Sequence, residues 1–125
     1  MAKREKLLSE LQAHLEPGEE VLEAVEGTWE TKTWGDESSR SGILAATDRR
    51  LVLFAKKLFG HDVKSFPYAS VSSFEVGKRF RSPYVKFDAS KKRFRLNWVK
   101  SEDLEGFGES VRGRIAAAVE ATAEP

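Results

Sequence analysis

Apolar and polar residues alternate with a period of two through much of the chain between residues 19 and 99. The clearest cases are residues 84–89 and 93–98, in which every second residue is apolar; in the second, Phe94, Leu96 and Trp98 are expected on the buried face. This alternation predicts β-strands with one buried face. The polar link at residues 90–92 joins these two strands as a hairpin.

A denser apolar stretch at residues 42–57 consists of two runs around the polar turn Thr47-Asp48-Arg49-Arg50, which predicts another hairpin. Gly27 indicates a bulge or a close backbone approach within a strand. Pro67 lacks the N–H that a central ladder needs, so its strand is expected to end there or to lie at an edge.

Two helical patterns flank the strands. At residues 3–15 a leucine stripe precedes Pro17-Gly18, and a helix this short is expected to dock, on its own domain by preference or otherwise on a second copy. Ser101 is a good N-cap for a second helix at residues 101–121. Five apolar side chains recur there at helical spacing and are expected to be buried: Leu104, Phe107, Val111, Ile115 and Val119.

These elements predict a single domain over residues 1–125, of the α+β class and mainly β. Seven antiparallel strands in hairpin succession would form a strongly bent sheet or partial barrel. The final apolar helix is expected to close the open end of this bent scaffold.

The composition excludes several classes of protein. Apolar residues make up 40% and charged residues 33%, and no apolar run approaches the roughly 20 residues of a spanning helix. With no cysteine, disulfides and cysteine nucleophiles are excluded. The N-terminus lacks the apolar stretch of a secretory signal, so a cytoplasmic location is expected. A peripheral location at the membrane is compatible with this expectation.

Positive charge is concentrated in residues 78–95, which hold eight basic residues and one acid and therefore carry a net charge of +7. The whole chain is +1, so the remainder is −6. This asymmetry indicates either an anionic partner or solvated strand faces that discourage edge pairing.

The chain resembles a bacterial pleckstrin-homology (PH) domain protein over about residues 15–119. The resemblance rests on residues 15–19, the hairpin at 42–51, the corner at 66–71 and the last helix. It implies a PH-like barrel of two near-orthogonal antiparallel sheets with a helical cap, used for binding or assembly without catalysis. No cofactor is expected. The first hairpin loop, which binds phosphoinositides in eukaryotic relatives, here balances Lys32 and Arg40 with Asp36 and Glu37, which argues against headgroup recognition.

If the strands simply alternate up and down, three loops emerge at the same end with aromatic tips among cations. This pattern suits an anionic membrane surface or a protein partner with an acidic rim. The alternative is that the aromatic tips fold inward and plug the barrel. The candidate surface consists of Trp34, Arg40, Lys56, Lys57, Phe59, Lys78, Arg79, Phe80 and Arg81.

Other functions have less support. Nucleic acid would need Phe80, Tyr84 and Phe94 as a stacking platform, although Phe94 fits the core better. Self-association through the leucine helix or the strand edge near Pro67 is an alternative compatible with membrane binding. The two histidines, His14 and His61, lie in no metal-binding or catalytic pattern, so neither a metal nor a small-molecule substrate is inferred.

Overall fold

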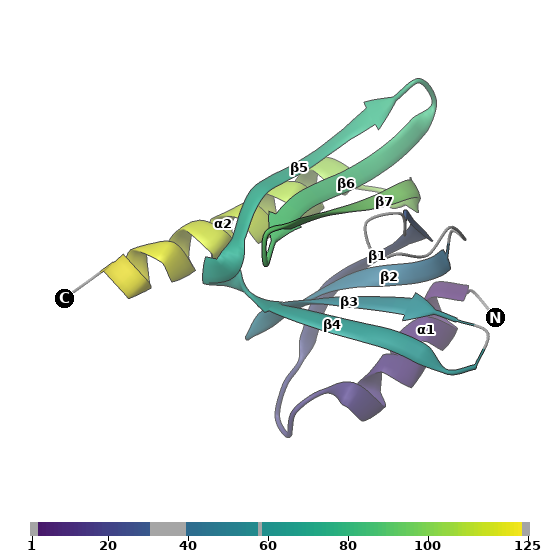
Figure 1. Ribbon diagram of the computed structural model, residues 1–125, viewed down its shortest axis with the longest axis horizontal. Coiled ribbons are helices and arrows are strands. Elements are labelled where there is room, and N and C mark those ends of the chain that lie inside the picture. Colours follow the sequence, from purple (N-terminus) through teal and green to yellow (C-terminus); the bar gives the residue numbers. More distant parts are fainter. Residues whose placement is uncertain (1–2, 31–39, 58, 124–125) are drawn as a thin grey trace.

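The structure, a computed structural model, describes residues 3–30, 40–57 and 59–123. In these ranges one short helix, seven strands and one long helix follow in the predicted order (Figure 1). The elements are α1 (Lys3–Leu11), η1 (Gln12–His14), β1 (Val21–Trp29), β2 (Arg40–Thr47), β3 (Arg50–Lys56), β4 (His61–Pro67), η3 (Tyr68–Ser70), β5 (Val71–Arg79), β6 (Ser82–Ala89), β7 (Lys92–Lys100) and α2 (Leu104–Ala123).

The strands form one hydrogen-bonded antiparallel sheet in the order β4-β3-β2-β1-β7-β6-β5. β1 lies at its centre and pairs with both β2 and β7, so it joins two halves that diverge in Figure 1. The two predicted sheets are thus continuous through β1. β4 is one edge of the sheet and ends at Pro67, which confirms the prediction for this proline.

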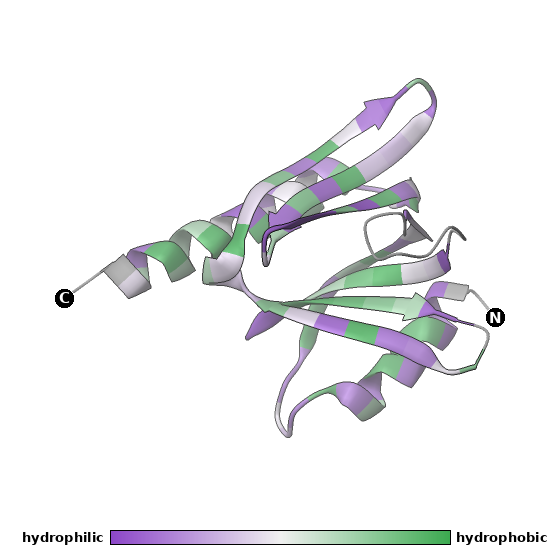
Figure 2. Cartoon of the chain, viewed as in Figure 1, coloured by the Kyte–Doolittle hydropathy of each residue, from purple (hydrophilic) through white to green (hydrophobic). Residues whose placement is uncertain are grey.

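α1 covers the outer face of the half formed by β1 to β4. Its side chains Leu7 and Leu11 are buried in a cluster with Ile43 of β2 and Phe54 of β3. β2 and β3 are therefore covered on both faces, and Figure 2 shows them as mostly hydrophobic. The prediction that this helix docks on its own domain is confirmed, and its buried leucines are not available to a second copy.

The main core lies between the two halves of the sheet and is closed by α2. Phe66, Phe74, Phe87 and Phe94 form a chain of ring contacts with centroids 5.0 to 5.8 Å apart. α2 adds Phe107, whose ring lies 6.3 Å from that of Phe74. The predicted capping role of the last helix is confirmed.

Only the first part of α2 packs closely on the sheet. Val111 is fully buried and Ile115 partly buried, whereas Val119 is 45% exposed. Figure 1 shows the last turns extending beyond the strands. The prediction that all five apolar side chains are buried is wrong for Val119, because the helix is longer than the surface it covers.

The alternation in β7 breaks at Trp98. This residue has a φ of 51°, in the left-handed region, as expected for the extra residue of a β-bulge. Val99 takes the next buried position and Trp98 is 62% exposed. The prediction that Trp98 shares the buried face with Phe94 and Leu96 is therefore wrong.

The partner strand accommodates this bulge at Gly27. The register between β1 and β7 shifts between Glu26 and Thr28, on either side of the glycine. A Cβ atom on Gly27 would lie 2.6 Å from the backbone oxygen of Asn97, which no real side chain tolerates. The predicted close backbone approach at Gly27 is confirmed.

Candidate functional site

The residues of the turn between β2 and β3 meet those that precede β1 around a buried ion pair. Arg50 donates from Nε and Nη2 to the two carboxylate oxygens of Glu19, each at 2.8 Å. The Glu19 side chain has no exposed surface. The hydrogen bond from Arg50 outweighs burial and lowers the pKa of Glu19 to about 2.

Thr47 connects this ion pair to the turn and to the η3 corner. Its hydroxyl donates to Glu19 at 2.7 Å and accepts the backbone N–H of Arg50 at 2.9 Å. Its carbonyl oxygen accepts the hydroxyl of Tyr68 at 2.5 Å, and burial raises the pKa of Tyr68 to about 12. Because Thr47 bonds to both Glu19 and Tyr68 and all three residues are buried, they stabilise the fold and offer little surface for binding.

The turn between β5 and β6 is the most exposed aromatic feature of the described chain. Phe80 is 92% exposed and occupies the first turn position with a φ of 58°. A backbone with positive φ favours glycine and is strained for a bulky residue. The folded core therefore gives no reason for a phenylalanine at this position.

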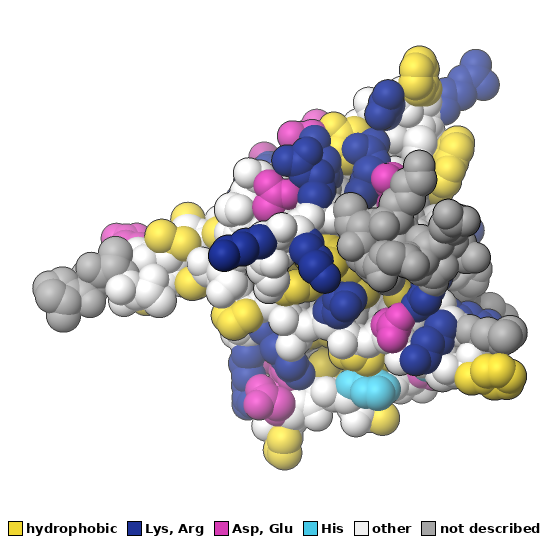
Figure 3. Space-filling model, viewed as in Figure 1, with side chains coloured by type: hydrophobic (Ala, Val, Ile, Leu, Met, Phe, Trp, Pro, Cys, Tyr) yellow, Lys and Arg dark blue, Asp and Glu magenta, His cyan; other side chains and the backbone are white. Residues whose placement is uncertain are grey.

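Three exposed cations surround Phe80 at this tip: Lys78, Arg79 and Arg81. None of them forms an ion pair with any residue in the described ranges, and the Arg79 guanidinium lies 6.0 Å from the centroid of the Phe80 ring. Figure 3 shows hydrophobic and basic side chains together at the end of this projecting hairpin. We refer to residues 78–81 as the hairpin tip.

The basic residues further along the same two hairpins are arranged differently. On the outer face of β6 and β7 the cations lie close to carboxylates, so much of their charge is balanced within the protein. The pairs are Lys86 with Glu75 at 3.8 Å, Arg93 with Asp88 at 3.0 Å and Arg95 with Glu30 at 4.0 Å. The +7 segment thus consists of a paired face, the unpaired hairpin tip, and Lys91 and Lys92 at the turn between β6 and β7.

The turn between β3 and β4 carries the second exposed aromatic side chain. Phe59 is 82% exposed, and Lys56 beside it is exposed as well. Lys57 lies 3.6 Å from Asp62, which also forms an ion pair with Arg40. Two of the predicted cations are therefore paired with this one carboxylate.

The structure shows whether some of the residues in the predicted surface are exposed. Phe59 and Phe80 point into solvent, so the alternative in which they plug the barrel is wrong. Trp34 lies outside the described residues. In Figure 1 the two turns lie on the same side of the molecule, as the alternation of strands predicts, but at separate corners because the two halves of the sheet diverge.

Trp98 is an aromatic residue at the surface, although the alternation in the sequence predicts that it is buried. Its backbone N–H donates to Ser82 Oγ at 3.1 Å, and Ser82 pairs with Arg79 next to the hairpin tip. The bulge in β7 therefore exposes an indole on a residue whose backbone bonds to the base of the hairpin that carries Phe80. The available signal was the adjacent apolar pair Trp98-Val99, which breaks strict alternation.

Residues 15–112 match a family model described as "Bacterial PH domain". The chain belongs to this family. The match includes both the buried ion pair and the hairpin tip of this PH domain. A comparison with curated proteins gives no match.

Solved structures share the fold of this PH domain at low sequence identity. One is the C-terminal domain of an unknown protein from Leishmania infantum, with 10% identity, a TM-score of 0.60 and coverage of 92% of this chain and 99% of that chain. A DUF1696 family protein with a pleckstrin-homology domain from Shewanella loihica PV-4 has 18% identity, a TM-score of 0.53 and coverage of 92% and 99%. A pleckstrin homology domain from Shewanella amazonensis SB2B has 22% identity, a TM-score of 0.51 and coverage of 91% and 96%.

The histidines of this PH domain have structural contacts. His61 stacks on Phe54 with ring centroids 4.4 Å apart, and its Nε2 lies 2.6 Å from a Glu10 carboxylate oxygen, which ties β4 to α1. No group of three potential metal ligands occurs in the part of the chain that the structure describes. Within the same ranges, no helix has both the length and the apolar character needed to span a bilayer.

The aromatic residues considered for nucleic-acid stacking do not share a face. Phe94 is buried in the core. Tyr84 lies on the outer face, where its hydroxyl donates to Glu75 at 2.6 Å and Arg95 covers its ring at 4.3 Å. Phe80 lies at the hairpin tip, so the three rings form no continuous stacking platform.

Proposed function

We propose that this PH domain is a non-catalytic module that docks on an anionic membrane surface through the hairpin tip. The observation that carries the proposal is Phe80, 92% exposed in a strained turn and surrounded by three cations without ion-pair partners in the described chain. Strained residues that folding does not explain are concentrated at functional sites.

The energetics of such a tip suit a bilayer interface. Each Lys or Arg near an anionic surface contributes about 1 kcal/mol, and burying a Phe side chain among acyl chains contributes about 1.5–3 kcal/mol. The hairpin tip is therefore expected to bind a membrane reversibly, because a single peripheral anchor of this size gives only weak affinity.

Two further exposed aromatics extend the proposed surface. Trp98 lies beside the base of the hairpin tip through its bond to Ser82, and tryptophan favours the headgroup region of a bilayer. Phe59 with Lys56 provides a separate contact at the other corner of the same side of the molecule (Figure 1). Both contacts can engage one membrane at the same time, whereas a small soluble anion can occupy only one of them. The domain would therefore bind a membrane more tightly than it binds such an anion.

Co-sedimentation with lipid vesicles tests this function. We expect binding to vesicles of phosphatidylserine and phosphatidylcholine, weaker binding at physiological than at low salt, and none to phosphatidylcholine alone. Phe80→Ser is expected to lower the partition constant about tenfold or more. Arg81→Gln is expected to lower it about fivefold.

Lys91→Gln is the matched control for charge. Lys91 lies in the turn between β6 and β7, is exposed and has the same charge, but no exposed aromatic side chain lies in that turn. We expect its partition constant to stay near that of the wild type. Equal losses for Lys91→Gln and Arg81→Gln, or full binding by Phe80→Ser, would show that the hairpin tip is not the docking site.

A further inference from the structure

β1 has an open edge over its first half. It pairs with β2 from Val21 to Trp29, but with β7 only from Glu26 onward. β7 ends at Lys100, and the chain then turns into α2. Within the described ranges, no strand pairs with residues 21–25 of β1 on this side.

The backbone of this edge has no strand partner within the described residues, and one of its carbonyl groups bonds to a side chain instead. The N–H of Glu30 donates to Arg95 of β7, and alternate residues of a strand present their backbone groups to the same side. Ala24 therefore faces the gap, and its carbonyl oxygen accepts Nε of Arg4 at 3.2 Å. A side chain from α1 thus supplies a donor that a neighbouring strand would supply elsewhere in the sheet.

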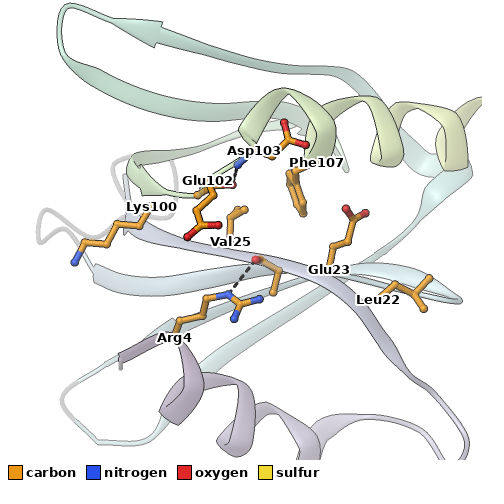
Figure 4. A pocket seen from close by; sticks show the side chains of 10 residues that line it. Arg4, Leu22, Glu23, Val25, Lys100, Glu102, Asp103 and Phe107 are labelled. Carbon is orange, nitrogen blue, oxygen red and sulfur yellow. Dashed lines mark hydrogen bonds between the residues drawn. The ribbon is translucent and has the colours of Figure 1, made fainter. Parts of the chain in front are cut away.

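A cleft of about 710 Å³ lies along this edge, between β1 and the start of α2. Its volume falls within the range of about 300–1,000 Å³ that ligand sites occupy. Figure 4 shows Val25 and Phe107 pointing into the cleft from opposite sides. Both side chains are buried and provide an apolar floor.

Three carboxylates (Glu23, Glu102 and Asp103) and two cations (Arg4 and Lys100) line the cleft, and the unpartnered oxygen of Glu23 is what favours a cation there. Glu23 points from β1 into the cleft, and its Oε2 atom is buried without a hydrogen-bond partner in the described chain (Figure 4). A buried carboxylate oxygen without a partner costs free energy that a donor from a ligand would recover. Asp103 already accepts the backbone N–H of Gly106 at 2.9 Å, so Glu23 is the carboxylate in the cleft that needs a donor.

We propose that this cleft binds an extended peptide segment that adds to the open edge of β1 as a strand. Backbone pairing would occur near Ala24 and displace the guanidinium of Arg4. On the inner face of the added strand, a Lys or Arg side chain would reach Glu23, and an apolar neighbour two residues away would contact Phe107. Such strand addition combines backbone affinity with side-chain specificity.

The test uses the full chain and a defined probe, the capped heptapeptide Thr-Leu-Thr-Lys-Thr-Leu-Thr. Titration followed by amide chemical shifts is expected to show saturable changes at Leu22, Ala24 and Phe107. Glu23→Gln is expected to weaken binding about tenfold or more, since it removes one partner of a buried charge pair. Glu26→Gln, on the same strand but outside the cleft, is expected to bind like the wild type.

Two control peptides need no protein variant. Replacing the peptide lysine by glutamate, or N-methylating alternate residues so that strand pairing is blocked, is expected to abolish the shifts. Equal binding of either control peptide, or no shift at β1 amides at high peptide concentration, would overturn the proposal. Binding of agmatine alone at Glu23, without peptide binding, would overturn it in favour of a small-cation site.

Discussion

At the scale of single residues, the buried ion pair of Glu19 and Arg50 is the interaction that most clearly stabilises this domain. Removing a carboxylate from water costs several kcal/mol, and only good geometry with additional hydrogen bonds offsets that cost. Here both oxygens receive guanidinium donors, and Thr47 donates a further bond. The pair holds the chain before β1 against the start of β3.

Glu19→Gln is therefore expected to lower the free energy of unfolding by about 3 kcal/mol, because Arg50 loses its charged partner. Urea denaturation at neutral pH measures this loss. Glu20→Gln is the matched control, since the neighbouring side chain is exposed, and it is expected to change stability by less than about 0.5 kcal/mol. Similar effects of the two variants would contradict a structural role for the ion pair.

The same pair predicts how stability depends on pH. The pKa of Glu19 falls from its ordinary 4.5 to about 2 in the folded chain, because Arg50 bonds the ionised form. Protons bind the unfolded state more readily, so this contribution is complete above pH 4.5 and is lost as the pH falls toward 2. The stability difference between wild type and Glu19→Gln is expected to shrink over this range, and a difference independent of pH would contradict the assignment.

At the scale of elements, the bulge in β7 explains why Trp98 is exposed and not buried in the core. Alternation correctly predicts the strand and the burial of Phe94 and Leu96. It cannot predict the position of an extra residue, because the bulge depends on how β7 meets β1 at Gly27, far away in the sequence. The position of the hairpin tip was predictable because a short polar turn fixes its own location, but the exposure of Phe80 was not, because the sequence allows the ring to fold inward as well.

The left-handed backbone conformation of Trp98 can be tested by substitution. In an ordinary strand valine is more stable than glycine, but a left-handed residue reverses this order. Trp98→Gly is therefore expected to be more stable than Trp98→Val by about 1 kcal/mol. Thermal or urea unfolding of the two variants measures this difference, and a more stable valine variant would show that Trp98 does not occupy a bulge.

At the scale of the whole molecule, the bent sheet separates the two exposed tips. Counting strands predicts that the turns after β3 and β5 emerge on one side, and Figure 1 agrees. The two halves diverge on either side of β1, which pairs with β2 along its length and with β7 only from Glu26, and strand order alone does not predict this. The pairing of Arg40 and Lys57 with Asp62 likewise depends on the register of neighbouring strands.

A site-specific environment probe tests the central claim, that the hairpin tip enters an anionic bilayer. The chain has no cysteine, so Phe80→Cys provides a unique attachment point for an NBD fluorophore. Ser90→Cys, in the exposed basic turn between β6 and β7, is the matched control. With phosphatidylserine vesicles we expect a blue shift and higher intensity at position 80 and little change at position 90. Unchanged emission at position 80, or equal shifts at both positions, would contradict the account.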